Sequence, residues 1–594
     1  MSLCVSMPLR LRKRLMPKNL GGLQQLMKQD GGKKDNKVRR AASTERETLL
    51  RELNALPGNK ILDRLLEIEN PREAVHSLSS GDFYWLVKRI GDEDCVPLLD
   101  LASTDQWQYL IDLEIWKRDR VDVALSWDWM KRLQQANSER LIKWLLNEGE
   151  AFTYYHLFKS VELIVTDNDD EVYTLPEGFF SLDGNVYIRV IDSNHRETIE
   201  NIIREISRRD FSRYQALVLG LGGLLPAETE EQMYRMKNVR LAEHGFLPHE
   251  EAISVYAPLE PENLGMRKEK GLDEVVVDDG VRAMVPLSPL VRAEATNVLT
   301  EGILRTADPA FLDRIRLEFA GLSNQLLAAD GLLTPELEVL TRSCRKAARY
   351  LNLALERLGG RDLSKAQEVL SNHSLVELFR VGFGLALKVK WEAERWVKGS
   401  WFYDQDLDVD FWGERWGGVL GGLLAKRPKL YVGDQEEEEY RDFEWLFELS
   451  ECSEVLRRLM VLDGLMARIA ESYPLEKEVT KSSEITFRPF LFNLWGRLLL
   501  DLEPGLSGLT LGEAKSFFEM LRGRSKKPPY VIDAFKKRFI SDFMSHTGDA
   551  DPEAVSILKD TLTLIWQDFS KEYEWVWPHD LDSRFSTFIT IRRS

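Results

Sequence analysis

The sequence predicts a mainly α-helical protein, with stacked helical hairpins at the N-terminus, a small antiparallel β-hairpin insertion and a C-terminal helical domain. Three observations predict it. A polar cap followed by an acid and an apolar helix face recurs up to residue 150, residues 161–190 switch to alternating β-branched residues, and long amphipathic runs fill the chain after residue 288. A chain of 594 residues is long enough for several domains.

Composition shifts and proline-rich stretches divide the chain into five expected parts. These are a basic disordered tail (1–42), a helical-hairpin repeat domain (43–150), an α+β segment with β-hairpins (151–260), a linker (261–289) and a C-terminal mainly helical domain (290–594). The linker is marked by Pro258, Pro261, Pro286 and Pro289.

The charge is divided unevenly between the tail and the rest. The net charge is −17, yet residues 1–42 hold eleven Lys/Arg against Asp30 and Asp35, so the tail carries +9 and the rest −26. An acidic body excludes a protein that coats nucleic acid, because such binding needs a basic surface. Weak contact with nucleic acid is expected only through the tail, which is either native or the product of a start upstream of Met7 or Met16.

The N-terminal helices are predicted from their caps. Ser43 precedes a helix with an apolar stripe that Pro57-Gly58 ends. Ser79, Ser103 and Asn137 each begin a similar pattern, in which the cap accepts free helix N–H groups and a nearby acid complements the positive helix end. The recurrence predicts stacked helical hairpins at a spacing too irregular for a strict solenoid.

A small sheet of three or four strands is predicted next. Its expected strands are 161–166, 171–175, 179–182 and 185–190, and Asp183-Gly184 is the strongest hairpin signal in the chain.

The remaining elements are predicted mainly as helices. They are expected at 195–208, 226–247 with Gly245 as C-cap, 250–256, 311–329, 335–358 and 364–396, with a possible short strand at 275–277 in the linker. Residues 399–433 are expected to be irregular, and Glu436–Glu439 to open or flank a helix that runs through Leu449.

Cysteine usage and hydropathy indicate a cytoplasmic protein. Cys4, Cys95, Cys344 and Cys452 lie far apart, without the spacing of a zinc or redox motif, and are expected to be reduced. The longest apolar stretch, 216–226, is too short to span a bilayer, and the N-terminus lacks the apolar core of a secretion signal.

Two loop motifs imitate ligand sites. Gly220-Leu221-Gly222-Gly223 resembles a dinucleotide loop, but residue 225 is leucine and Glu228 would repel a pyrophosphate, so a glycine-rich break between helices is favoured. Asp167–Glu171 begins like a calcium loop but lacks the required glycine and glutamate at the later positions, which favours a solvated turn.

The segment DQDLDVD carries the alternating residues Asp404, Asp406, Asp408 and Asp410. In an extended strand all four would face one way, and a hard cation would relieve their repulsion. The alternative is a solvated acidic loop, and the sequence leaves open whether Asp404–Asp410 binds a cation.

Two further clusters have a structural and a functional interpretation. His244 and His249 bracket a turn with Glu243, Glu250 and Glu251, but their spacing fits no closed zinc site, which favours capping and surface roles. The aromatic residues around Trp391–Trp416 indicate either an interface or an aromatic core, and the core is favoured. We therefore predict no metal and no cofactor, and name no catalytic residue.

Two segments carry a family resemblance. The run from Met236 to Leu259 and that from Ser374 to Gly384, together with Leu110–Trp116 and the Leu182–Gly184 hairpin, resemble an uncharacterised bacterial family with a domain of unknown function. The resemblance covers nearly the whole chain after the tail and implies a bacterial cytosol, but no activity. Residues 98–113 also resemble the helical superhelix of magnesium-transporter regulatory domains and the related flagellar motor-switch helices, without implying transport.

The leading hypothesis is a cytosolic protein-interaction or regulatory scaffold, because stacked helix pairs create extended binding surfaces. The first alternative is a hydrolase or transferase with a non-standard, metal-assisted site near Asp404–Asp410 or His244–His249. The second is a nucleic-acid-associated protein that acts through the basic tail. Whether the protein is an enzyme, and its oligomeric state, stay open at this stage.

Overall fold

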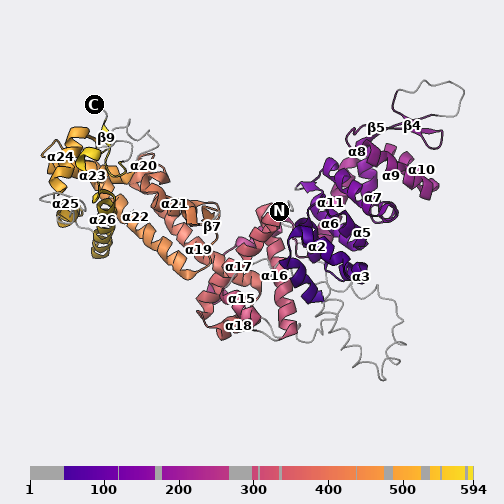
Figure 1. The fold of residues 1–594 in the computed structure, drawn as a ribbon, viewed down its shortest axis with the longest axis horizontal. Coiled ribbons are helices and arrows are strands. Elements are labelled where there is room, and N and C mark those ends of the chain that lie inside the picture. The colour runs from indigo at the N-terminus through magenta and orange to yellow at the C-terminus, as the bar shows by residue number, and fades with distance from the viewer. Residues whose placement is uncertain are drawn as a thin grey trace, which may run out of the picture. The chain divides into compact units, whose positions relative to one another are not determined.

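The computed structural model describes residues 46–117, 119–166, 177–265, 290, 297–305, 308–332, 337–435, 438–473, 486–522, 535–548, 551–581 and 586–592. Helices dominate these residues, which confirms the predicted mainly α-helical fold (Figure 1). The chain forms two compact units. Of the described residues, unit 1 comprises 46–115, 122–166, 177–226 and 290, and unit 2 comprises 116–117, 119–121, 227–265 and those from 297 onward.

Unit 1 is a run of helices followed by a small sheet and two more helices. After a helix over 46–55, its elements are α2 (Gly58–Leu66), α3 (Pro71–His76), α4 (Ser80–Ile90), α5 (Val96–Leu101), α6 (Thr104–Glu114), α7 (Val123–Leu146), α8 (Glu150–Ser160), β3 (Val161–Val165), β4 (Phe180–Ser181), β5 (Val186–Val190), α9 (Arg196–Arg209), α10 (Phe211–Gly220) and the 3-10 turn η2 (Leu221–Gly223).

The helices α2 to α7 of unit 1 pack in a regular order, in which each helix from α2 to α5 contacts the helix after next. The contacting pairs are α2 with α4, α3 with α5, α4 with α6, and α5 with α7. Figure 1 shows α5, α6 and α7 together. This order is that of the predicted stack of helical hairpins. The helices α2, α4 and α6 form one layer, and α3, α5 and α7 form the other.

The predicted caps begin two of these helices. The Ser79 hydroxyl accepts the N–H of Asp82 at the start of α4, and Ser103 forms a capping box with Gln106 at the start of α6. Asn137 lies at a kink within α7, where its side chain accepts the N–H of Arg140 and so caps the second half of the helix.

The sheet of unit 1 is antiparallel and three-stranded, with the order β3-β5-β4. Val161 pairs with Val190 and Val165 with Val186, while Asp183 accepts the N–H groups of Asn185 and Val186 in the predicted hairpin turn. Gly184 has a φ of 80°, which favours glycine. The possible strands at 171–175 and 275–277 lie outside the described residues.

Unit 2 contains the remaining elements. They are β1 (Trp116–Lys117), β2 (Arg120–Val121), α11 (Pro226–Ala242), α12 (His249–Ala252), η3 (Ile253–Tyr256), η4 (Pro261–Asn263), α15 (Val298–Leu304), α16 (Pro309–Asp330), α17 (Leu337–Gly359), α18 (Leu363–Asn372), α19 (Leu375–Val397), α20 (Trp401–Asp404), η5 (Val409–Trp412), α21 (Gly413–Leu424), β6 (Leu430–Tyr431), η6 (Gly433–Gln435), β7 (Tyr440–Arg441), α22 (Leu446–Ser472), α23 (Phe487–Leu499), β8 (Leu509–Thr510), α24 (Leu511–Arg522), α25 (Lys536–Met544), α26 (Pro552–Tyr573), η8 (Pro578–Asp580) and β9 (Ile591–Arg592).

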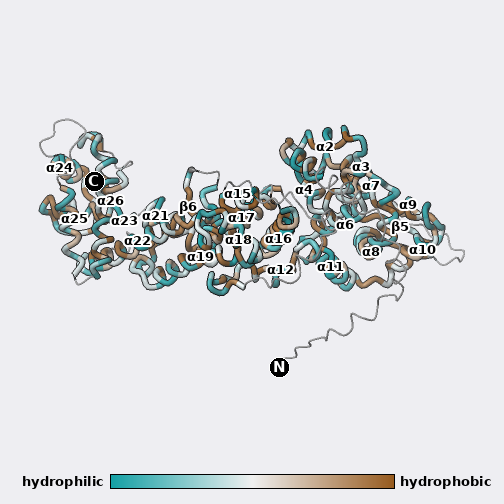
Figure 2. Tube along the Cα trace, turned by 90° about the horizontal axis from the view of Figure 1, so that it is seen from below, coloured by the Kyte–Doolittle hydropathy of each residue, from teal (hydrophilic) through white to brown (hydrophobic). Residues whose placement is uncertain are grey.

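The core of unit 2 is built from long amphipathic helices. α16 and α17 pack together, α17 packs on α19, and α22 packs on both α19 and α26. Figure 2 shows polar and apolar stretches alternating along these helices, as amphipathic packing requires. Near the C-terminus the core is aromatic, and Phe492 stacks on Phe569 with ring centroids 4.2 Å apart.

Three predictions for unit 2 are wrong in detail. The run predicted at 364–396 is two helices, α18 and α19, because Ser374 and Glu377 form a capping box that starts a new one. The segment 399–433, expected to be irregular, contains α20, η5 and α21. The helix expected from Glu436 begins only at Leu446, after strand β7.

Candidate functional sites

The glycine-rich segment of unit 1 lies at the end of a helix. Ala216–Leu219 belong to α10 and Leu221–Gly223 form η2, so the strand that a dinucleotide loop must follow is a helix here. Leu219 and Leu225 are 59% and 60% exposed. The segment therefore presents apolar side chains to solvent at a break between helices.

The four aspartates of the DQDLDVD segment are all exposed. Asp404 ends α20, Asp410 lies in the turn η5, and Asp406 and Asp408 lie between these elements, so the extended conformation that would align them is not formed. Asp406 has a φ of 55°, and the Asp408 carboxylate accepts the N–H of Val409. The Asp167–Asp170 turn lies outside the described residues.

His249 and the backbone of His244 both contact α16. The His249 ring lies with Nδ1 2.7 Å from the carbonyl oxygen of Ala328, to which an Nδ1–H would donate, while the His244 carbonyl accepts from the Asn324 side chain. Burial lowers the pKa of His244, against the opposing attraction of Glu243. Among the described residues, no group of three His, Cys, Asp or Glu side chains is arranged to hold a metal ion.

Three members of the aromatic cluster, Phe402, Phe411 and Trp412, are buried in unit 2, while Trp396, Trp401 and Trp416 are half-buried. Trp412 is 1% exposed and packs against Phe402, Phe411 and Phe487. Trp391 and Tyr403 are the members with large exposed fractions, 43% and 57%.

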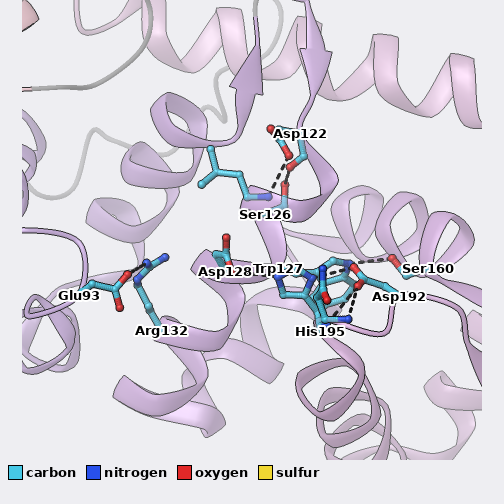
Figure 3. A network of polar contacts seen from close by, with 11 residues as sticks. Glu93, Asp122, Ser126, Trp127, Asp128, Arg132, Ser160, Asp192 and His195 are labelled. Atoms are coloured by element: carbon cyan, nitrogen blue, oxygen red, sulfur yellow. Dashed lines mark hydrogen bonds and ion pairs between the residues drawn. The ribbon is translucent and has the colours of Figure 1, made fainter.

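The structure brings together a histidine and two aspartates that the sequence analysis did not connect. His195 Nδ1 lies 2.8 Å from Asp192 Oδ2, and His195 Nε2 lies 3.0 Å from Asp128 Oδ1 (Figure 3). Asp128 comes from α7, whereas Asp192 and His195 precede α9. The two carboxylates face opposite ring nitrogens, so one metal ion cannot be bound by all three side chains.

Neighbouring contacts hold this cluster in place. Trp127, next to Asp128 on α7, is buried and donates its Nε1–H to Ser160 of α8 at 2.8 Å. Asp192 also accepts the backbone N–H groups of Asn194 and His195. Burial opposes the charge on His195, but its hydrogen bonds to Asp192 and Asp128 raise its pKa above the ordinary value.

A second buried cluster lies between α4 and α6. Tyr84 donates its hydroxyl to Glu114 Oε1 at 3.0 Å, and Lys88 Nζ lies 3.2 Å from the same oxygen. Burial raises the pKa of Glu114 to about 7, although Lys88 and Tyr84 act in the opposite direction.

The third cluster, in unit 2, centres on Asp330 at the end of α16. Its carboxylate accepts from Tyr256 and from Lys346, each at 2.6 Å, and pairs with Arg427. Burial lowers the pKa of Lys346. Arg427 also donates to the Ala329 carbonyl at 2.9 Å, so it complements the negative end of α16.

The three clusters share one property: the central group is already occupied by partners in the protein. Both nitrogens of His195 face carboxylates, and both oxygens of Asp330 accept from protein donors. A general base must instead present a free atom to its substrate. Each cluster links elements that are distant in sequence.

Comparison with known proteins identifies one family. The model of the family described as "Family of unknown function (DUF6178)" matches residues 39–592. No curated protein and no solved structure matches the chain. The likeness of residues 98–113 to magnesium-transporter regulatory domains is thus supported by no named relative. None of the described helices is long and apolar enough to cross a membrane.

Proposed function

The chain belongs to this family of unknown function, and we propose that it is a protein-interaction scaffold whose partner binds unit 1. The observation that carries the proposal is the packing order of α2 to α7 in unit 1, in which each helix from α2 to α5 contacts the helix after next. Helical stacks of this kind offer long continuous surfaces made of repeated helix faces, and such surfaces bind other proteins. As its location we propose the bacterial cytosol, in keeping with the buried thiols of Cys95 and Cys452, which form no disulfide among the described residues.

A specific part of the surface supports the proposal. Between Arg213 and Glu228 the chain carries no charged residue, and this uncharged segment includes the end of α10 and η2. Leu219 and Leu225 expose more than half of their surface there. An added Cβ at Gly222 or Gly223 would meet nothing, so the backbone is also open to a partner. Exposed apolar groups of this kind are typical of protein contacts.

The enzyme alternative names either of two segments, Asp404–Asp410 or His244–His249. Asp404–Asp410 are exposed on α20 and η5, whereas His249 packs against the Ala328 carbonyl. No observation in the described part of the chain favours that alternative over the scaffold.

Isolation of the tagged protein from its native cells tests the proposal. We expect a partner at fixed stoichiometry with the wild type, and its loss in the Leu219→Asp/Leu225→Asp variant, because a buried charge without a partner prevents an apolar contact. Leu66→Asp is the matched control, since Leu66 is 52% exposed on α2 and lies outside the uncharged segment.

Two outcomes would contradict the proposal. One is a monomer by light scattering that recovers nothing at fixed stoichiometry. The other is equal recovery of the partner by both aspartate variants, which would place its contacts away from the uncharged segment.

A further inference from the structure

The His195 cluster has a geometry that only one protonation state satisfies. Both ring nitrogens lie within hydrogen-bond distance of carboxylate oxygens, Nδ1 of Asp192 and Nε2 of Asp128. A neutral imidazole carries one N–H donor and one acceptor, whereas the imidazolium carries two donors. Carboxylate oxygens only accept, so both contacts are hydrogen bonds only when His195 is protonated.

Loss of the proton breaks one particular contact. Asp192 is held in its loop by the N–H groups of Asn194 and His195, so its bond to Nδ1 is retained. The Asp128 side chain is 49% exposed and can turn into solvent, away from an unprotonated Nε2. The contact that is lost is the one that joins α7 to the start of α9.

Other charged groups on α7, α8, β5, α9 and α10 are engaged with partners of their own. In the described structure, Arg132 of α7 pairs with Glu93, Arg189 of β5 with Glu162, Arg196 of α9 with Glu200, Arg213 of α10 with its N-cap Asp210, and Lys159 of α8 lies over the Tyr155 ring. Asp122 caps α7 through the N–H of Leu125, while Lys131 and Glu197 are exposed. Asp128 and Asp192 are therefore the charges that govern its protonation.

We propose that Asp128, His195 and Asp192 form a proton-controlled tie between α7 and α9, closed when His195 is protonated and open when it is neutral. The ordinary histidine pKa lies near 6.5, and the two aspartates raise that of His195. The tie therefore weakens as pH rises. It stabilises the α7–α9 contact fully below the pKa of His195 in the unfolded protein, and this stabilisation is lost as pH rises through the higher pKa of His195 in the folded protein. The opening therefore occurs at a pH above the ordinary histidine pKa of 6.5.

Hydrogen exchange of the full chain, followed by mass spectrometry, tests the proposal. Protection of peptides from the first turns of α9 is compared at pH 6 and pH 8.5 after correction for the intrinsic exchange rate. We expect a loss of roughly tenfold in wild type, the effect of one charge-assisted hydrogen bond. Peptides from α17 serve as the internal reference.

Variants separate the tie from a general effect of pH. In Asp128→Asn the amide can donate to a neutral ring or accept from a protonated one, so protection of α9 becomes independent of pH. His195→Gln carries no titrating group and also removes the pH dependence. Glu197→Gln removes an exposed charge at the same helix start and should behave as wild type. An α9 protection that is equal at both pH values in wild type, or that falls equally in Asp128→Asn, would overturn the proposal.

Discussion

The hydroxyl of Tyr214 in α10 is expected to lower the stability of unit 1. Its ring is fully buried, its hydroxyl has no hydrogen-bond partner among the described residues, and burial raises its pKa to about 12. A buried hydroxyl without a partner loses its hydration and gains nothing in return. Tyr84, by contrast, donates to Glu114.

We predict opposite effects of the same change at these two tyrosines. Tyr214→Phe should leave the stability of unit 1 unchanged or raise it by about 1 kcal/mol, while Tyr84→Phe should lower it by a similar amount. Thermal unfolding of the two variants beside wild type measures this. A Tyr214→Phe variant that melts well below wild type would show that the hydroxyl has a partner.

Glu114 should make the α4–α6 contact sensitive to pH. Its pKa rises from 4.5 to about 7 on burial, so the protonated form is favoured in the folded state. Stability is therefore fully present below pH 4.5 and is lost as pH rises through about 7, by about 3 kcal/mol in total.

Glu114→Gln should abolish this slope, since the amide does not titrate and still accepts from Tyr84. The free energy of opening of α6, from hydrogen exchange between pH 5 and pH 8, is the measurement. Glu73→Gln, at an exposed position on α3, is the control and should keep the slope. An identical slope in Glu114→Gln would assign the pH dependence to another group.

At the scale of elements, glycine decides how closely α17 and α19 approach. A Cβ added to Gly382 on α19 would lie 2.0 Å from the Tyr350 carbonyl oxygen, which is backbone and cannot rotate away. Gly464, inside α22, has open space around it. The close packing of α17 on α19 therefore requires glycine at 382, whereas packing does not require it at 464.

The two glycines therefore predict opposite results for substitution by alanine. Gly382→Ala should destabilise unit 2 by about 1–3 kcal/mol through overpacking. Gly464→Ala should stabilise it by about 0.5–1 kcal/mol, because alanine loses less backbone entropy in a helix. Denaturant unfolding of both variants checks the pair, and equal effects would contradict the close contact of α17 and α19.

Helices could be predicted from the sequence where the residues that mark their ends lie close together along the chain. Ser79 and Ser103 predict their helices because the capping hydroxyl and the backbone N–H from which it accepts lie within one turn. α21 was missed because its paired glycines indicate a break, yet Gly417 and Gly422 are needed where the helix approaches the backbone of Val409 and Lys429. The start of α19 could have been found from its Ser374–Glu377 capping box.

The clusters were beyond prediction because their members are far apart in sequence. Asp192 and His195 lie three residues apart and are a recognisable local motif, but Asp128 lies 67 residues away, and Tyr256 is 74 residues from Asp330. Only the packing of α7 against α9, and of α16 against η3, brings these side chains together.

At the scale of the whole molecule, the acidic body consists of two helical units whose described polar clusters are internally paired. Pairing of this kind supplies ties between helices and leaves the exposed apolar residues as the surface available to a partner. The hypothesis that emerges is a scaffold that binds through unit 1, with a tie at His195 that responds to pH.

Site-specific photocrosslinking in native cells tests this account most directly. A photoreactive amino acid placed at Leu219 should crosslink to one protein partner in high yield, whereas the same group at Leu66, on the same unit and similarly exposed, should not. Crosslinks of equal yield and identity at the two positions, or none at Leu219, would contradict the assignment of the uncharged segment as the binding surface.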